Sequence, residues 1–258
     1  MILVALLIAV IAAAIFLFAA PPAWFPAPIS ALAATFDAQF NRTLWLIGAG
    51  FLLVQLLLIY VVVRYRRNGK PPANFAGSVR LEVIWTSITA LLFFGLALMG
   101  MPVFTVPQLG PEPPGAEIIE VDAHQFAWNF HYPGPDGKFG HTNLRLISDA
   151  GGNPLGLDPA DPTAKDDIVK STLRVPVERD VVLMLKSRDV VHDFFVRELR
   201  VKQDVVPGME IPYRFRATRT GAFEIACAEL CGLGHSQMRA VMLVLPSAEY
   251  DQWKTHPQ

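Results

Sequence analysis

Charged residues are scarce in this chain of 258 residues, and neither sign dominates. Asp, Glu, Lys and Arg make up only 17% of the sequence and the formal net charge is −1, whereas 52% of the residues are hydrophobic. A chain this close to neutral has no basic excess with which to hold phosphates, so we expect no nucleic-acid partner. The balance is typical of a protein that is partly embedded in membrane lipid.

Cysteine is almost absent as well. The chain has two cysteines, Cys227 and Cys231, which are too few and too close together to form a disulfide framework. The sequence also contains no Cys-x-x-Cys-His motif, so we expect no haem attached to this chain and any haem donor to be a separate polypeptide. The cysteines are therefore expected to have a local role.

Long apolar runs, by contrast, occur three times. Residues 2–20, 44–63 and 83–104 are each long and apolar enough to cross a bilayer as a helix. The first run also fits a cleaved signal peptide, because Ala19 and Ala20 are small residues near its end, but it lacks a basic start. We expect it to be a retained, extra N-terminal helix; the topology of the remainder is the same in both cases.

Basic residues cluster between the second and third apolar runs. Such a loop stays in the cytoplasm during insertion. The two runs therefore predict a transmembrane hairpin in the inner (cytoplasmic) membrane, with everything after Phe104 on the periplasmic or outer side. The basic residues are Arg64, Arg66, Arg67, Lys70 and Arg80, and no acidic residue precedes Glu82.

The part after the hairpin is predicted to be a β domain. In residues 180–187, Val181, Leu183 and Leu185 alternate with Val182, Met184 and Lys186, which is the period of a half-buried strand. Many such short runs favour a Greek-key sandwich or barrel, with a long loop over 148–167. The expected strands are 117–123, 126–132, 172–178, 180–187, 211–217, 222–226 and 239–245. The expected divisions are an N-terminal helix and linker (1–43), the hairpin (44–104), a linker (105–116) and the β domain (117–258).

One segment of twelve residues gathers the side chains of a metal site. It reads Cys227-Ala-Glu229-Leu-Cys231-Gly-Leu-Gly-His235-Ser-Gln-Met238. Thiolate, imidazole and thioether donors together favour copper. The segment lies between two predicted strands, 222–226 and 239–245, so its side chains are expected to converge at one end of the barrel.

The number of donors bears on the number of ions. A single blue-copper ion would leave one of the two thiolates unused, whereas two bridging thiolates would hold two coppers. Each copper would then need an imidazole, from His235 and from His192 at the end of a predicted strand, with Met238 and the Glu229 carbonyl as remaining ligands. A simple disulfide and a zinc site of two Cys and two His remain alternatives. His192 could also be an ordinary buried histidine, and Met238 an ordinary core residue.

The segment resembles the binuclear copper A loop of cytochrome c oxidase subunit II, a highly specific motif. The resemblance extends over about residues 40–250 and implies a cupredoxin-like barrel on a two-helix hairpin, to which the N-terminal helix is an addition. Further matching segments are Leu81–Thr86, Ala123–Tyr132, Asp189–His192 and Lys202–Gly208.

The resemblance implies a role for each matching residue. Cys227 and Cys231 would bridge two copper ions, with His192 and Met238 on one ion and His235 and the Glu229 carbonyl on the other. The Glu229 side chain would face a magnesium ion shared with subunit I. Glu82 would lie near the mouth of a proton pathway, although an interfacial carboxylate at a helix start explains it equally well.

The same resemblance implies a function and partners. The chain would pass electrons from a cytochrome c-type donor through copper A to haem in subunit I, where oxygen is reduced to water with proton translocation. A third subunit is also expected. No open coordination position is left for a substrate, so the chain is expected to carry electrons and not to hold the oxygen-reducing site.

Two features depart from the family pattern. Phe126 stands where the electron-receiving Trp is usual, so Phe126 and Trp128 are the candidate relay residues. The segment after Tyr132 has few carboxylates, and Arg197 replaces a common proline. A soluble lysine-rich donor would be steered by acidic groups, so these differences favour a membrane-bound or tethered haem donor, or mainly apolar docking.

Other functions remain open at this point. The copper subunit of a membrane nitric oxide reductase shares the anchor and the loop, and the haem subunit would discriminate between the two. A membrane-anchored copper-binding or delivery protein would hold its copper loosely. A quinol oxidase subunit is disfavoured by the intact ligand set, and nitrous oxide reductase by the helices and the short chain.

Overall fold

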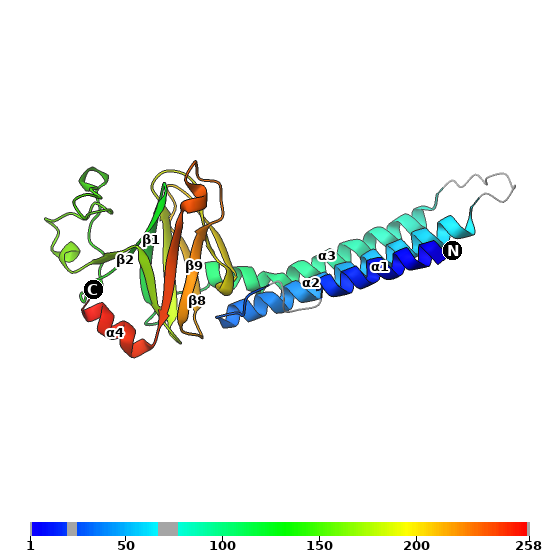
Figure 1. The fold of residues 1–258 in the computed structure, drawn as a ribbon, viewed down its shortest axis with the longest axis horizontal. Coiled ribbons are helices and arrows are strands. Elements are labelled where there is room, and N and C mark those ends of the chain that lie inside the picture. The colour runs from blue at the N-terminus through cyan, green and yellow to red at the C-terminus, as the bar shows by residue number, and fades with distance from the viewer. Residues whose placement is uncertain (1, 20–24, 67–76, 257–258) are drawn as a thin grey trace. The chain divides into compact units, whose positions relative to one another are not determined.

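The computed structural model describes residues 2–19, 25–66 and 77–256, and its internal contacts divide the chain into two units. The helical unit comprises residues 1–21 and 36–102, and the β unit comprises residues 22–35 and 103–258. Figure 1 shows the elements of both. Long apolar helices followed by a mainly β domain, as the sequence predicts, are confirmed.

Three long helices make up most of the N-terminal part: α1 (Ile2–Ala19), α2 (Ala31–Arg64) and α3 (Val79–Leu109) (Figure 1). Within the described residues, α2 and α3 are long and apolar enough to span a membrane. A Cβ placed on Gly100 of α3 would lie 3.9 Å from the Gln39 side chain of α2, so the start of one helix meets the end of the other. The pair is therefore an antiparallel hairpin. The helical state of α1 fits both a retained helix and a signal sequence.

The predicted bounds of the hairpin were too narrow. The helix expected from residue 44 begins at Ala31, and the one expected to end at residue 104 continues to Leu109, so the first residues of the predicted linker are helical. The apolar run marks only the part of a helix that lipid would surround. Backbone hydrogen bonds continue through polar residues such as Asp37 and Asn41 beyond it.

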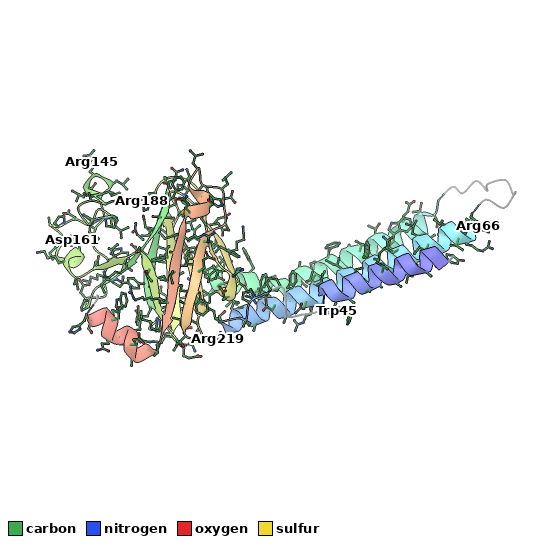
Figure 2. The ribbon with its side chains drawn as sticks, viewed as in Figure 1. Trp45, Arg66, Arg145, Asp161, Arg188 and Arg219 are labelled. Carbon is green, nitrogen blue, oxygen red and sulfur yellow. The ribbon has the colours of Figure 1, made fainter. Side chains whose placement is uncertain are left out.

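Side chains at the ends of the α2 apolar run suit a membrane interface. Trp45, at its start, is 61% exposed, and Arg66 follows the other end of the helix (Figure 2). Tryptophan and arginine are both favoured where lipid meets water. These two residues therefore bracket the predicted membrane-spanning part of α2.

The β unit is built from two five-stranded sheets (Figure 1). In the first sheet, β1 pairs in parallel with β5 and antiparallel with β2. In the second, β10 pairs in parallel with β4 and antiparallel with β9. The first sheet runs β3 (Ile168–Lys170), β2 (Ala127–Tyr132), β1 (Glu117–His124), β5 (Asp180–Ser187) and β8 (Ile211–Arg216). The second runs β4 (Thr172–Pro176), β10 (Arg239–Leu245), β9 (Gly221–Cys227), β6 (His192–Val196) and β7 (Val201–Val205).

The core lies between the two sheets. Val181, Leu183 and Leu185 of β5 are fully buried, as their alternation predicts. Val182 on the opposite face is also buried, so that face of β5 is partly covered as well. All seven predicted strands are present, with ends that shift by one or two residues. The largest fully buried side chains include Trp128, Phe130, Tyr132, Leu173 and Phe194.

Among the strands and α-helices of the described residues, three strands (β3, β6 and β7) and a C-terminal helix, α4 (Ser247–Thr255), were not predicted. The interpretation of His192 as the end of a predicted strand was wrong, because His192 is the first residue of β6. Both β6 and its neighbour β7 contain polar residues that break the alternating pattern of a strand. Asp193 in β6, for example, lies directly opposite Asp204 in β7. Buried polar groups interrupt the alternation on which the prediction depended.

The segment ahead of α2 is part of the β unit. Ser30 forms a β-bridge with Ala217, and the backbone N–H of Thr218 donates to the Ile29 carbonyl at 2.7 Å. Ile29 is fully buried, and the Arg200 guanidinium lies 4.9 Å from the centre of the Phe25 ring. The chain therefore contributes to the β domain once before the hairpin and again after it.

A buried histidine ties the long loop to the first sheet. His131 of β2 is fully buried, and its ring nitrogens lie 2.9 Å from a Glu120 oxygen and 2.7 Å from an Asp167 oxygen. The Asp167 carboxylate also accepts from the backbone N–H of Gly140 at 2.7 Å. Lys186 reaches the other Glu120 oxygen at 2.6 Å. This group, Glu120, His131, Asp167 and Lys186, is called the His131 cluster below.

Candidate metal centre

The predicted metal loop is closed by the sheet on either side of it. Cys227 is the last residue of β9, and Met238 directly precedes β10. The Cys227 backbone N–H donates to the Met238 carbonyl at 3.1 Å, which brings the ends of the loop together. His192 begins β6, which pairs with β9 so that Phe194 lies opposite Cys227. The sheet thus places a residue from a distant segment beside the loop.

The predicted donor atoms converge. Cys227 Sγ lies 3.8 Å from Cys231 Sγ and 3.9 Å from His192 Nδ1. Cys231 Sγ lies 3.7 Å from His235 Nδ1 and 3.8 Å from Met238 Sδ. Two donors that bind one tetrahedral ion at about 2.3 Å lie roughly 3.7 Å apart. The spacing is therefore that of donors around a metal, and the residues fit a copper site.

The burial and the chemistry of these donors bear on the two alternatives to a copper site, a disulfide and a zinc site. Cys227, Cys231, Met238 and His192 are all buried, and both thiols are free, so the structure does not contain the simple disulfide. The donor atoms of His192, Cys227 and Cys231 all lie within 4.8 Å of one another. A fully buried thioether beside the thiols is a soft donor, which favours copper over zinc.

The two imidazoles both present Nδ1 to the sulfurs. The Nε2 of His192 lies 2.8 Å from Asp189 Oδ1. Since a carboxylate only accepts, His192 Nε2 carries a proton, and in the neutral ring Nδ1 then has the lone pair. His235 is only partly buried, in a 3-10 turn (His235–Gln237) that begins within the loop.

Burial and hydrogen bonds set the pKa values around the loop. Burial, reinforced by the neighbouring Cys227 thiol, raises the pKa of Cys231 to about 11. The Cys231 thiol of the metal-free protein therefore holds its proton, and metal binding would release it. Burial would also raise the pKa of Asp189, but hydrogen bonds from His192 and the backbone N–H groups of Gln125 and Val190 outweigh it and hold that pKa below its ordinary value.

Glu229 presents two groups in different directions. Its backbone carbonyl lies 3.2 Å from Cys227 Sγ, within reach of the donor cluster. Its side chain is exposed. One residue thus offers a backbone oxygen to the centre and a carboxylate to whatever covers the loop.

The two candidate relay residues differ in exposure. Phe126 is 38% exposed, and a Cβ on Gly234 would lie 2.5 Å from its ring. The Phe126 ring therefore rests on the loop, and a side chain at Gly234 would displace it. Trp128 is 2% exposed, with its ring 6.2 Å from the His192 ring and nearly at right angles to Phe194. Phe126 can touch a docked protein, whereas Trp128 is buried against His192 and Phe194.

Glu82 is not part of this cluster. It lies in the first turn of α3, in the helical unit, and its side chain is exposed. The backbone N–H of Glu82 donates to the Ser78 carbonyl at 3.0 Å.

Two residues that the sequence did not single out complete the site. Asp189 holds His192, and Gln125 Nε2 donates to the Cys231 carbonyl at 2.6 Å. The signal for Asp189 was available, since it stands three residues before the histidine. Gln125 had none, because only the tertiary structure brings the turn between β1 and β2 onto the loop.

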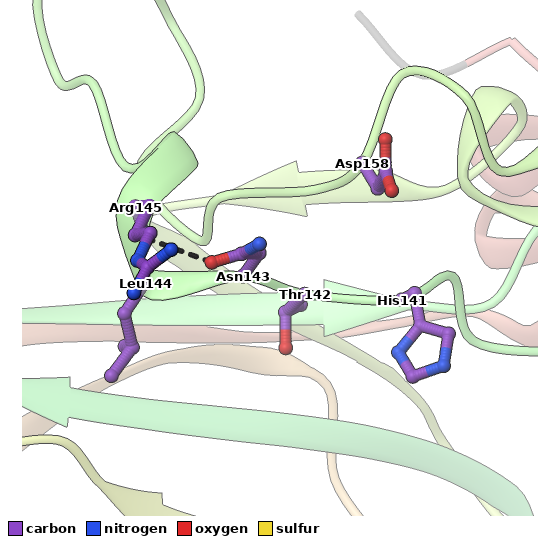
Figure 3. Close-up of a pocket in the computed structure, with 6 residues that line it drawn as sticks. All are labelled: His141, Thr142, Asn143, Leu144, Arg145 and Asp158. Carbon is purple, nitrogen blue, oxygen red and sulfur yellow. Dashed lines mark hydrogen bonds between the residues drawn. The ribbon is translucent and has the colours of Figure 1, made fainter.

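An open cavity lies elsewhere in the β unit, between residues 141–145 and Asp158. Its volume is about 520 Å³, and Arg145 N donates to Asn143 Oδ1 at 3.0 Å on its wall (Figure 3). His141 and Asp158 also line it without converging on a common point (Figure 3). It offers no donor set comparable to the loop.

Comparison with protein families gives two matches. Residues 118–245 match the periplasmic domain of cytochrome c oxidase subunit II, and residues 22–103 match the transmembrane domain of the same subunit. Together these models span most of the chain.

Individual relatives agree with these matches. The alternative cytochrome c oxidase subunit 2 of Bradyrhizobium diazoefficiens is 37% identical over 97% of this chain and 90% of its own length. The cytochrome c oxidase subunit 2 of Synechocystis is 31% identical over 88% of this chain and 74% of its own. Among solved structures, the periplasmic domain of cytochrome oxidase subunit II of Bradyrhizobium japonicum is 26% identical, with a TM-score of 0.40, over 55% of this chain and 93% of its own.

Proposed function

Because this chain belongs to the cytochrome c oxidase subunit II family, we propose that it passes electrons from a cytochrome c-type donor through a binuclear copper A centre to haem in subunit I. There, oxygen would be reduced to water with coupled proton translocation. The chain is a subunit of a haem–copper oxidase, an enzyme complex, and serves electron transfer into it. The oxygen-reducing site would lie in another chain.

The observation that carries this proposal is the convergence of six donor groups. Cys227 and Cys231 would bridge two copper ions, because each sulfur lies within 3.9 Å of an imidazole and of the other sulfur. When bound, the copper pair would supply a one-electron relay. The terminal ligands would be His192 and Met238 on one ion, and His235 and the Glu229 carbonyl on the other.

The surrounding residues would keep the relay rigid and dry. Met238 and His192 are fully inaccessible to solvent, and the two cysteines are nearly so. Asp189 holds the His192 ring through Nε2, and the hydrogen bond from the Cys227 backbone N–H to the Met238 carbonyl closes the loop at its base. The donors therefore have little freedom to move. A site that cannot reorganise suits electron transfer more than substrate binding.

Phe126 is proposed as the first residue to meet the donor. It is an exposed aromatic ring that rests on the copper loop, and Trp128, two residues later, is buried beside His192. Leu230 and Leu233 in the same loop are 78% and 105% exposed. An apolar contact with a membrane-bound or tethered cytochrome c-type donor agrees with these side chains.

Two carboxylates are assigned further roles in the complex. The exposed Glu229 side chain would reach a magnesium ion shared with subunit I. Glu82, exposed at the start of α3, would lie at the cytoplasmic mouth of a proton pathway in that subunit. Both assignments depend on partner chains, of which subunit I and subunit III are the expected ones.

The orientation follows from charge. The chain is a membrane protein. Within the part that the structure describes, α2 and α3 are long and apolar enough to span the membrane, and basic residues from Arg64 to Arg80 occur in and beside the connection between them. We place this connection in the cytoplasm and the β domain on the periplasmic side of the inner membrane.

The test is the activity of the complex purified through a tag on this chain. Reduced cytochrome c would be supplied, with oxygen and nitric oxide offered separately. We expect oxygen uptake that Cys227→Ser abolishes and that Ser236→Ala, an exposed change in the same loop, leaves intact. Nitric oxide consumption without oxygen uptake would identify a nitric oxide reductase subunit. A chain that purifies alone with loosely held copper would identify a copper-delivery protein.

A further inference from the structure

Asp189 uses both of its carboxylate oxygens on the metal centre. Oδ1 accepts from His192 Nε2 at 2.8 Å and from the Val190 backbone N–H at 2.7 Å. Oδ2 accepts from the backbone N–H of Gln125 at 2.7 Å. The side chain is 31% exposed. One carboxylate therefore joins the segment ahead of β6 to the turn between β1 and β2.

The hydrogen bond between Asp189 and His192 determines which ring nitrogen of His192 is directed at the thiols. A neutral imidazole carries one proton, and the hydrogen bond to Asp189 keeps it on Nε2. The lone pair is then on Nδ1, 3.9 Å from Cys227 Sγ. A carboxylate behind a ligating imidazole also makes the ring a stronger donor.

The second contact holds the surface turn in place. The Gln125 side chain donates from Nε2 to the Cys231 carbonyl at 2.6 Å, while its backbone N–H is bound by Asp189. A Cβ on Gly232 would lie 2.8 Å from Gln125 Nε2 and 3.0 Å from the Phe126 ring. The turn that carries Phe126 is thus pinned on the loop from both sides.

We propose that Asp189 is a positioning residue that sets the reduction potential of the metal through His192 and fixes the Gln125–Phe126 turn over the loop. The proposal deepens the proposed function and rests on it. An anionic acceptor behind the imidazole stabilises the oxidised, more positive metal, so Asp189 lowers the potential. The same Asp189 side chain keeps the exposed Phe126 ring in place over the metal loop.

Charge alone does not explain such a role. Asp193 is adjacent to His192 and is 1% exposed, but its carboxylate faces Lys202 at 3.5 Å and not the imidazole ring. Asp204 lies opposite Asp193 on the neighbouring strand and is exposed. Asp204→Asn therefore removes a carboxylate beside Asp193 without removing a contact to the His192 ring, and it serves as the matched control.

The experiment compares the wild-type complex with Asp189→Ala, Asp189→Asn and Asp204→Asn. The readouts are a redox titration of the copper absorption and the loss of copper to a chelator. We expect Asp189→Ala to raise the potential and to weaken copper retention about 10-fold. Asp189→Asn should raise the potential but retain copper, because its amide oxygen can still accept a hydrogen bond from the His192 Nε2–H group. Asp204→Asn should change neither readout appreciably.

Each outcome of this experiment either supports or overturns the proposed role of Asp189. Wild-type potential and copper retention in Asp189→Ala would overturn the proposal, as would an equal shift of potential in Asp204→Asn. If Asp189→Ala does not assemble, Asp189→Asn decides alone: a raised potential with full copper supports the role, and an unchanged potential overturns it. A wild-type complex without copper would overturn the proposed function itself, which separates the two failures.

Discussion

Two histidines are fully buried in the β unit, and their surroundings differ in one respect. His131 meets a carboxylate at each ring nitrogen, Glu120 at 2.9 Å and Asp167 at 2.7 Å. His192 meets a carboxylate at one nitrogen only, and its other nitrogen faces a thiol. The first ring has no lone pair left for a metal, whereas the second does. The partner of the second nitrogen therefore separates a structural histidine from a proposed ligand.

The largest expected effect separates the two rings by copper content. His192→Gln removes the donor nitrogen, so we expect the purified complex to lose copper and electron transfer from cytochrome c. His131→Gln should keep its copper, because no donor in the loop changes. Metal analysis and oxygen uptake measure both variants. Loss of copper from His131→Gln in a folded complex would contradict the comparison.

The second expected effect is on stability, and here the larger change is expected at His131, not at His192. His131→Gln leaves the buried Asp167 carboxylate without its charged partner, which we expect to cost about 3 kcal/mol in the free energy of unfolding. Denaturant unfolding of the β domain within the detergent-solubilised chain, followed by tryptophan fluorescence, measures the loss. A stability equal to that of the wild type would show that the His131 cluster is not an essential clamp on the long loop.

A third prediction concerns pH. Burial lowers the pKa of His131, but hydrogen bonds to Glu120 and Asp167 outweigh it, and the net pKa is raised above 6.5. Burial raises the pKa of Glu120, but bonds to His131 and Lys186 outweigh it and the net pKa is below 4.5. His131 therefore stabilises the fold fully below pH 6.5 and loses this effect as pH rises through its folded pKa. Glu120 stabilises above pH 4.5 and loses its effect as pH falls through its own.

The stabilisation by the cluster should thus be greatest between pH 4.5 and 6.5. Unfolding curves of the metal-free chain at a series of pH values measure it. In His131→Gln the decline above pH 6.5 that belongs to this ring should disappear. A decline that persists unchanged would assign it to another group.

The smallest expected effect is at the aromatic neighbour of His131. The Phe139 ring lies 4.9 Å from the His131 ring in an edge-on contact, so Phe139→Leu should cost about 1 kcal/mol. Copper content and potential should not change, because Phe139 is remote from the loop. The same unfolding assay measures the loss, and a change in copper absorption would count against the independence of the two sites.

The agreement between sequence and structure is uneven for physical reasons. The hairpin and seven strands were predictable because apolar runs and alternation report directly on burial. β6 was not, since His192 and Asp193 are buried polar residues that break the alternation. The bounds of α2 were missed because a helix does not end where its apolar run does.

What the sequence determined by itself is the chemistry of the metal loop. Two thiols, an imidazole and a thioether stand within twelve residues, and this combination of donors by itself favours copper. His192 and Phe126 were also expected from the sequence, but the tertiary structure decided how distant residues reach the loop and added Asp189 and Gln125 to them. Pairing of β6 with β9 brings His192 and Asp189 to the loop, and the turn between β1 and β2 brings Gln125 and Phe126. These contacts depend on strand register, which is set by packing across the whole core and not by local sequence.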